Sequence, residues 1–88
     1  MADGAKALRA AFKELDAKRQ ALELEIEVLA SRTMEGEALV DTEGFPRGDI
    51  DVWTVRTERA KLAELHTDHK RVTADIERVM AQIFDAER

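Results

Sequence analysis

Two long stretches of the chain carry apolar residues at alternating spacings of three and four, which place side chains on one face of an α-helix. They predict a helix from about Ala5 to about Met34 and another from about Ile50 to about Ala86. The apolar stripe of the first is Leu8, Phe12, Leu15, Leu22, Ile26 and Leu29, interrupted by Arg19. The stripe of the second is Val55, Leu62, Leu65, Val72, Ile76, Val79 and Ile83, interrupted by Glu58 and His69.

The ends of both helices carry recognisable signals. Asp3 is a candidate N-cap of the first helix, and Gly36 is a candidate stop signal after it. Asp49 or Asp51 can cap the second helix, because a carboxylate accepts hydrogen bonds from the free backbone N–H groups. Leu24 and Val28 lie off the first stripe, and we expect them to widen the buried face.

Two such helices with one connection predict an all-α fold, an antiparallel two-helix coiled-coil hairpin. If the helices face each other from the connection outward, the numbers of facing residues add to roughly 86, given equal rise per residue along both helices. Arg19 then lies level with Asp68 and His69. We expect a polar layer there, in which Arg19 meets Asp68 or His69 and fixes the register.

The connection, ALVDTEGFPRGDIDVW from Ala38 to Trp53, is long, acidic and yet apolar. Residues 36–51 hold five acidic residues and one base, so most of the chain's net charge of −5 lies here. Gly44 and Gly48 bracket Phe45-Pro46-Arg47, which predicts a tight turn between them. Apolar side chains such as Leu39, Phe45 and Trp53 are unusual in a solvated linker, so they cap the end of the core, bind a partner, or do both, with one face packed and the other presented.

The segment LVDTEGFPRGDIDVWTVRTERAKLAELHTDHK resembles the N-terminal domain of the PDZ-containing proteasome-assembly chaperone family, whose members are called 26S proteasome non-ATPase regulatory subunit 9. Three blocks of residues carry the resemblance. They are Leu39-Val40-Asp41 with Glu43-Gly44-Phe45-Pro46-Arg47, then Asp49-Ile50-Asp51 with Val55-Arg56, and last Asp68-His69-Lys70. With the flanking helices, the resemblance extends over nearly the whole chain.

The resemblance implies a function for one helical domain spanning residues 1–88. Members of the family bind the C-terminal domain of a proteasomal AAA+ ATPase of the base, regulatory subunit 6A, and sterically block premature assembly. They also carry a downstream PDZ domain, which these 88 residues do not include. For this chain we expect a chaperone module of the cytoplasm and nucleus that is monomeric when free. The expected partner-binding residues are Phe45, Arg47, Asp49, Asp51, Trp53 and Arg56.

Other readings of the sequence have less support. The heptad stripes alone would also suit a coiled-coil oligomerisation or scaffold segment without a chaperone role. Arg47-Gly48-Asp49 matches an integrin-binding tripeptide, but three residues match by chance too often to carry weight. His66 and His69 share a helix face without a clear third metal ligand.

Chemistry of other kinds is not expected from this composition. The chain has no cysteine, and its one serine, Ser31, lacks a nucleophile-elbow context. We therefore predict a protein that is not an enzyme and has no metal and no other cofactor. We expect no nucleic-acid partner, because the net charge is acidic, and no membrane partner, because no apolar run is long enough to span a bilayer.

Overall fold

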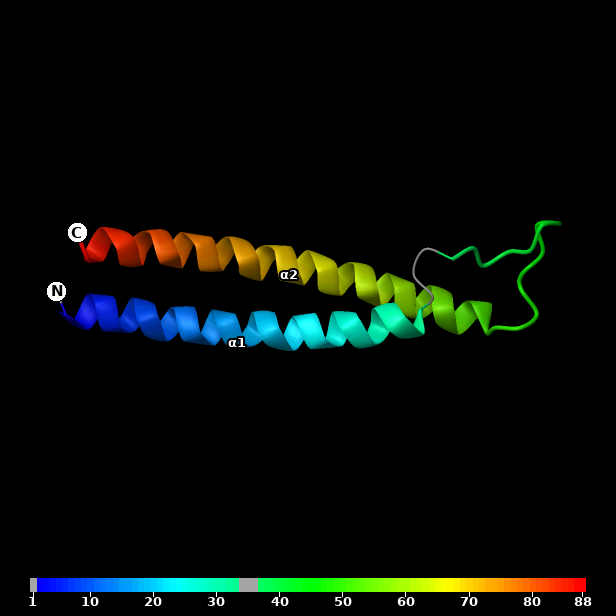
Figure 1. Ribbon diagram of the computed structural model, residues 1–88, viewed down its shortest axis with the longest axis horizontal. Helices are drawn as coiled ribbons and strands as arrows, with labels where there is room; N and C mark the ends of the chain where they lie inside the picture. The colour runs from blue at the N-terminus through cyan, green and yellow to red at the C-terminus, as the bar shows by residue number, and fades with distance from the viewer. Residues whose placement is uncertain (1, 34–36) are drawn as a thin grey trace.

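The structure, a computed structural model, describes residues 2–33 and 37–88 and consists of two antiparallel helices. Helix α1 runs over Ala2–Arg32 and helix α2 over Val52–Ala86. They lie side by side along most of their length, with both termini at one end of the rod and the connection at the other (Figure 1). The predicted all-α hairpin is confirmed, and the only strand-like pairing in the described residues is an isolated antiparallel bridge between Val40 and Pro46.

The core is a single seam between the two helices. The buried apolar side chains all belong to α2 and all lie on its predicted stripe; they are Val55, Leu62, Leu65, Ile76 and Val79. The predicted stripe of α1 faces them but is only half-buried along its length. A seam this thin covers one side of each helix, so most of the surface of α1 remains open to solvent.

Three expectations about α1 need correction. The helix already includes Ala2, so Asp3 lies inside its first turn and not at the N-cap position. Leu24 and Val28 do not widen the buried face, since their side chains are 65% and 53% exposed. The helix ends at Arg32. Met34 and Gly36, the predicted end and stop signal, lie outside the described residues.

Helix α2 begins with a well-formed cap. The Asp51 carboxylate accepts hydrogen bonds from the Thr54 backbone N–H at 3.1 Å and from the Thr54 hydroxyl at 2.8 Å. These bonds hold the pKa of Asp51 below its usual range, because they stabilise the charged carboxylate. Of the two predicted caps, Asp51 is therefore the one that the helix uses, and α2 begins two residues after the predicted Ile50.

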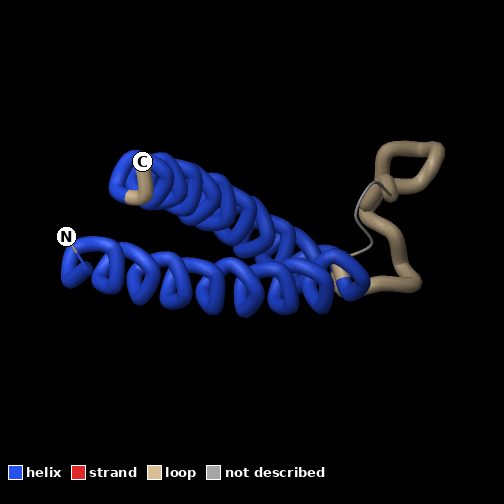
Figure 2. The backbone as a smooth tube through the Cα atoms, turned by 60° about the vertical axis from the view of Figure 1, so that its left-hand side comes forward, coloured by secondary structure: helices blue, strands red, loops and turns tan. Residues whose placement is uncertain are grey.

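The molecule is a rod of 66 × 16 × 14 Å with a radius of gyration of 19.4 Å. A compact domain of this length would have a radius of gyration of about 12 Å. The loop contributes to the length because it projects beyond the ends of both helices instead of folding back over the seam (Figure 2).

The register of the hairpin differs from the predicted one. Ion pairs join Arg32 to Glu58 and Arg9 to Glu87, so the numbers of facing residues add to 90 and 96. Helix α2 accordingly starts beyond the end of α1, and its first two turns or so overhang the connection. The prediction assumed that the helices meet level at the connection, whereas a long loop allows one helix to begin further out.

The predicted polar layer has a different arrangement from the expected one. Arg19 does not reach α2; its guanidinium donates to Asp16 at 2.6 Å and to Glu23 at 2.9 Å on its own helix. Glu23 makes the connection between the helices, with its carboxylate 3.1 Å from His69 Nε2. Asp68 is exposed and lies outside this network.

These contacts set the charge state of the layer. The pKa of Glu23 lies below its usual range, first because of the hydrogen bond with His69 and then because of the one from Arg19. In this register Arg19 and His69 lie about one helical turn apart rather than level, and Glu23, which the prediction had not included, joins them.

Candidate functional site

The connection folds into a small hairpin of its own. The Asp41 N–H donates to the Phe45 carbonyl at 2.7 Å, and the Arg47 N–H donates to the Leu39 carbonyl at 3.1 Å. Together with the bridge between Val40 and Pro46, these bonds pair two short arms. The backbone of both arms is thereby held in place by hydrogen bonds within the loop, which makes it an ordered element instead of a flexible linker.

Asp41 builds the turn between the two arms. Its Oδ1 atom accepts from the backbone N–H groups of Glu43 at 2.9 Å and Phe45 at 3.0 Å, and its carbonyl accepts from Gly44 N–H at 3.1 Å. Gly44 has a φ of 87°, a conformation that side chains with a Cβ disfavour. The tight turn therefore lies at residues 41–44, one step before the predicted Phe45-Pro46-Arg47, which forms the returning arm.

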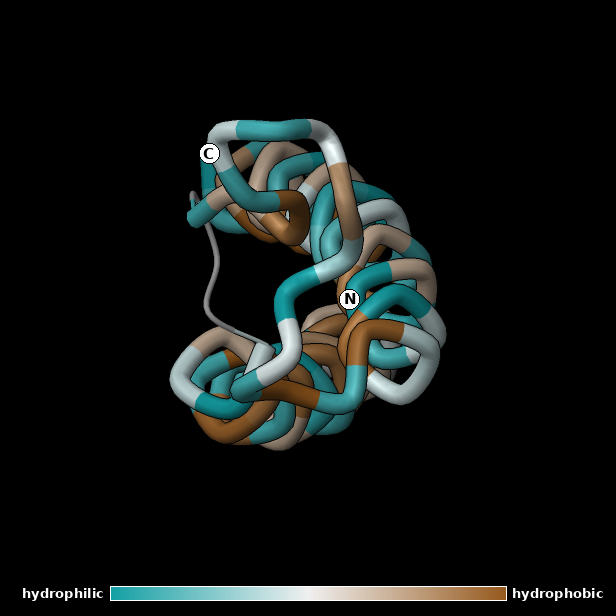
Figure 3. Tube along the Cα trace, turned by 90° about the vertical axis from the view of Figure 1, so that its right-hand side faces the viewer, coloured by the Kyte–Doolittle hydropathy of each residue, from teal (hydrophilic) through white to brown (hydrophobic). Residues whose placement is uncertain are grey.

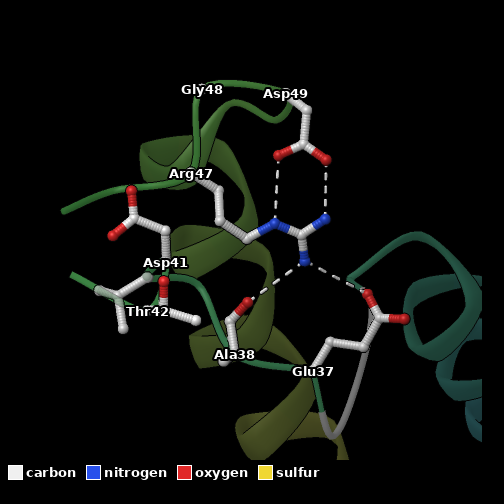
Figure 4. Close-up of a pocket in the computed structure, with 8 residues that line it drawn as sticks. Glu37, Ala38, Asp41, Thr42, Arg47, Gly48 and Asp49 are labelled. Carbon is white, nitrogen blue, oxygen red and sulfur yellow. Dashed lines mark hydrogen bonds and ion pairs between the residues drawn. The ribbon is translucent and has the colours of Figure 1, made fainter. Parts of the chain in front are cut away.

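Arg47 ties the returning arm to its surroundings (Figure 4). Its Nε and Nη2 atoms donate to the two carboxylate oxygens of Asp49 at 3.1 and 2.7 Å, and Nη1 donates to the Ala38 carbonyl at 3.3 Å. Glu37 adds an ion pair at 3.6 Å. The pair with Arg47 holds the pKa of Asp49 below its usual range, and the Asp49 carboxylate raises that of Arg47.

An open hollow of about 580 Å³ lies beside this ion pair, between the two arms and the turn at Gly48. The guanidinium that faces it is already engaged by Asp49, and the rest of the lining includes the carboxylates of Glu37 and Asp41. A phosphate or a carboxylate ligand would meet an arginine whose fork is occupied and two further negative charges. The hollow therefore has the chemistry of a structural ion-pair cluster rather than of a small-molecule site.

Arg59 anchors the loop to the helices. Its Nε donates to the Thr33 carbonyl at 3.0 Å, and its Nη2 donates to the Glu37 carbonyl at 2.9 Å. The first bond satisfies a backbone carbonyl at the end of α1, where a cation is also favoured by the helix dipole. Thr33 itself is fully buried. The Arg59 side chain thus holds the chain's own connection in place.

The large apolar side chains of the loop end point into solvent. Trp53 is 75% exposed, Phe45 63% and Val40 51%, whereas Leu39 is half-buried. Phe45 and Trp53 therefore do not cap the core, which was one of the two open readings. We call the exposed side chains of Val40, Phe45 and Trp53, with the Arg47–Asp49 ion pair beside them, the tip surface.

The predicted site residues fall into two groups. Phe45 and Trp53 are exposed and available to a partner, and Arg56 is exposed and makes no hydrogen bond or ion pair to another described residue. Arg47, Asp49 and Asp51 are engaged within the chain, by the ion pair and by the helix cap. The charged residues of the loop thus shape the tip surface, while the aromatic residues are presented on it.

Two negative findings limit the chemistry of the described residues. In the ranges 2–33 and 37–88, no three or more His, Cys, Asp or Glu side chains gather in a way that could hold a metal ion. His66 and His69 do not form such a group with Asp68. Neither of the described helices is both long and apolar enough to cross a membrane.

Comparison with known proteins decides the family. Residues 12–85 match the model of the Nas2 N-terminal domain. The chain belongs to this family. The resemblance read from the loop and the second helix is thereby confirmed, and the matched range includes the tip surface, nearly all of α2 and the C-terminal two thirds of α1.

Named relatives agree with the Nas2 N-terminal domain assignment. The chain is 36% identical over 78 residues to the probable 26S proteasome regulatory subunit p27 of Schizosaccharomyces pombe, covering 83% of this chain and 37% of the relative. It is 38% identical over 77 residues to the 26S proteasome non-ATPase regulatory subunit 9 of Homo sapiens, covering 81% and 34%. The protein of the same name in Drosophila melanogaster is 40% identical over 74 residues, covering 77% and 33%.

The chain spans about a third of the length of these curated relatives. No solved structure gives a significant match. The shared region is the Nas2 N-terminal domain, so the structural features that bear on its function are those of the hairpin and its loop.

Proposed function

We propose that this domain is the partner-binding module of a proteasome regulatory-particle assembly chaperone. The curated relatives are named as regulatory subunits of the 26S proteasome, which supports a role on that particle. In this proposal the partner is the C-terminal domain of a AAA+ ATPase of the base, regulatory subunit 6A, as the family resemblance implies. The module acts by binding rather than by catalysis, in the cytoplasm and nucleus.

The observation that carries the proposal is the exposure of Trp53 and Phe45 on an ordered scaffold. A tryptophan and a phenylalanine that are 75% and 63% exposed leave large apolar surfaces in water. Exposed aromatic side chains of this kind are typical anchors of protein interfaces. The turn at Asp41 and the clamp of Arg59 fix the backbone around them, so a partner would not have to pay the full entropy of ordering the loop.

The charged residues of the tip surface set its polarity rather than serving as free anchors. Arg47 and Asp49 neutralise each other, while Asp51 is bound by Thr54. Reversing the charges of Asp49 and Asp51 would break the ion pair and the helix cap together. Such a variant would confuse loss of binding with loss of structure, and substitution of the exposed aromatic residues is the cleaner test.

The proposed mechanism is steric. The rod is 66 Å long and only 16 Å wide, and its tip lies beyond the ends of both helices. Bound by its tip, the rod would extend from the ATPase surface and occupy space that a neighbouring subunit needs. Release of the module would then open that surface for the next step of assembly.

Calorimetric titration of this chain against the isolated C-terminal domains of all six base ATPases tests the proposal. We expect binding to the domain of regulatory subunit 6A and much weaker or no binding to the other five. Absence of binding to all six, with helical circular dichroism intact, would contradict the proposed partner class. Equal binding to several of them would contradict the proposed selectivity.

A further inference from the structure

Helix α1 carries a second apolar seam on the side away from α2. Ala17, Ala21, Leu24 and Val28 follow one another at spacings of four, three and four, the spacing of a helix-packing stripe. At about 100° per residue they fall within one narrow arc on the side of the helix opposite to the core stripe. All four are exposed, Leu24 and Val28 to 65% and 53%. We call these four residues the outer seam.

The surface around the outer seam is shaped to receive side chains. Leu24 stands between two shallow hollows, one also lined by Val28 and Leu29, the other by Gln20 and Glu27. The hydropathy colouring shows apolar stretches on the outside of the helices as well as between them (Figure 3). A knob flanked by hollows is the local geometry of helix-on-helix packing.

We propose that the outer seam binds a second copy of this chain, with the two α1 helices antiparallel. In the favoured register, the numbers of facing residues add to 45. Ala21 then faces Leu24 of the second copy, and Ala17 faces Val28 of the second copy. Each large side chain meets a small one, so the four apolar layers fill without overpacking and allow the helices to approach closely.

Charges beside the seam select this register. When the seam layers add to 45, the residues that flank the seam on one side add to 43, so Lys18 lies beside Glu25 of the second copy, and the two-fold symmetry repeats the pair. Lys18 and Glu25 are exposed, and neither forms an ion pair with another described residue. Both partners are therefore free to pair between copies.

Both neighbouring registers place like charges together. A shift of one heptad to a seam sum of 52 moves the flanking sums to 50 and 54, which brings Glu25 beside Glu25 and Glu27 beside Glu27 of the second copy. A shift to a seam sum of 38 brings Lys18 beside Lys18 of the second copy, since those flanking residues add to 36, and places Glu14 against Leu24 in the seam itself. Like charges directly opposite each other are unfavourable, so the one register with good packing is also the one with complementary charge.

The contact is short, which sets its strength. The outer seam spans twelve residues, a helix length of about 18 Å, and its area is well below that of a standard stable interface. We therefore expect a reversible dimer with a dissociation constant on the order of 0.1 mM. This differs from the monomer expected in the sequence analysis. The two tip surfaces would point to opposite ends of the dimer, so self-association and tip binding are independent.

Sedimentation equilibrium of the intact 88-residue chain, from about 10 µM to about 1 mM, tests the proposal. The wild type should show a mass that rises with concentration toward that of a dimer. Lys18→Glu and Glu25→Lys should each weaken dimerisation at least about fivefold, since each converts two attractive pairs into repulsive ones. The double variant, Lys18→Glu with Glu25→Lys, should restore it, because it reverses the pairs and keeps them complementary.

Two further variants guard against trivial outcomes. Leu24→Lys should abolish dimerisation without loss of helicity, because this side chain is exposed in the free chain. Phe84→Ala, at an exposed site elsewhere, should leave dimerisation unchanged. A concentration-independent monomer mass for the wild type would overturn the proposal. So would a double variant no better than the single ones, or a Leu24→Lys variant that dimerises normally.

Discussion

The thin seam between the helices predicts that single core residues carry a large share of the stability. Leu62 is only 3% exposed and lies in the N-terminal third of α2, on the stripe that faces α1. Leu62→Ala should cost about 2–3 kcal/mol of unfolding free energy. This is the lower part of the range for buried leucines, because the half-buried side chains of α1 can settle into the space.

That cost is large for a domain of this size. A chain of 88 residues has a typical unfolding free energy of roughly 4–13 kcal/mol, and 1 kcal/mol shifts its melting temperature by about 4–8 °C. We therefore expect Leu62→Ala to lower the melting temperature by about 8–24 °C. Urea unfolding followed by circular dichroism at 222 nm gives the free energy directly.

Leu24→Ala is the matched control, since it removes the same atoms from an exposed position of the other helix. It should change the unfolding free energy by no more than about 0.5 kcal/mol when measured near 5 µM, well below the concentration of self-association. If Leu24→Ala destabilised the chain as much as Leu62→Ala, the account of a single one-sided core would be refuted.

Three further predictions concern the loop and the polar layer. Gly44→Ala should cost about 1–2 kcal/mol, because φ is 87° there, and hydrogen exchange should report faster exchange of loop amides with the helices unaffected. The pKa of Asp51 is lowered on folding, so its contribution to stability is present above its unfolded pKa near 3.8 and is lost as the pH falls below that value. Thermal melts from pH 6 to pH 2 should show the melting temperature falling in acid, and the fall should be smaller for Asp51→Asn. His69→Leu should raise the melting temperature, since an apolar residue replaces a half-buried polar one on the stripe and Glu23 keeps its bond to Arg19. A lower melting temperature would show that the Glu23–His69 hydrogen bond contributes more to stability than the added packing.

The helices were predictable because their signal is local. Apolar spacing repeats along each helix, and every buried side chain of α2 lies on the predicted stripe. The cap at Asp51 follows from the same local logic, because a carboxylate three residues before a helical N–H can accept its hydrogen bond. The core face therefore needed no knowledge of the other helix.

The register and the connections between distant residues were less accessible. The overhang of α2 depends on how the loop uses its length, and the bond from Arg59 to Thr33 joins residues 26 positions apart. The turn at Asp41 could have been found, since Asp followed three residues later by Gly is a common turn signal. Because the prediction placed the turn between Gly44 and Gly48, it located the turn just C-terminal to its actual position at residues 41–44.

The candidate site could be located from the sequence but not resolved into its parts. The residues of the loop pointed to the tip of the hairpin, yet the sequence left open whether Phe45 and Trp53 face the core or the solvent. That choice depends on where the loop stands relative to the helix ends, which no local pattern encodes. The role of the charged residues likewise emerged only from the ion pair and the cap.

The central claim is that the tip surface binds the ATPase partner, and Trp53 tests it most directly. A tryptophan has roughly 250 Å² of surface, so 75% exposure leaves about 190 Å² for a partner, worth at most about 5 kcal/mol. After the costs of association, we expect Trp53→Ala to lose at least about 2 kcal/mol of binding free energy, which is a roughly 30-fold larger dissociation constant.

Calorimetric titration of the wild type, Trp53→Ala and Phe84→Ala against the C-terminal domain of regulatory subunit 6A is the decisive measurement. Phe84 is a matched control because it is also an aromatic residue of α2, 67% exposed, at the far end of the rod. The account predicts weakened binding for Trp53→Ala, with an unchanged melting temperature, and wild-type binding for Phe84→Ala. Wild-type affinity for Trp53→Ala, with weakened binding for Phe84→Ala, would contradict it and place the interface at the other end of the hairpin.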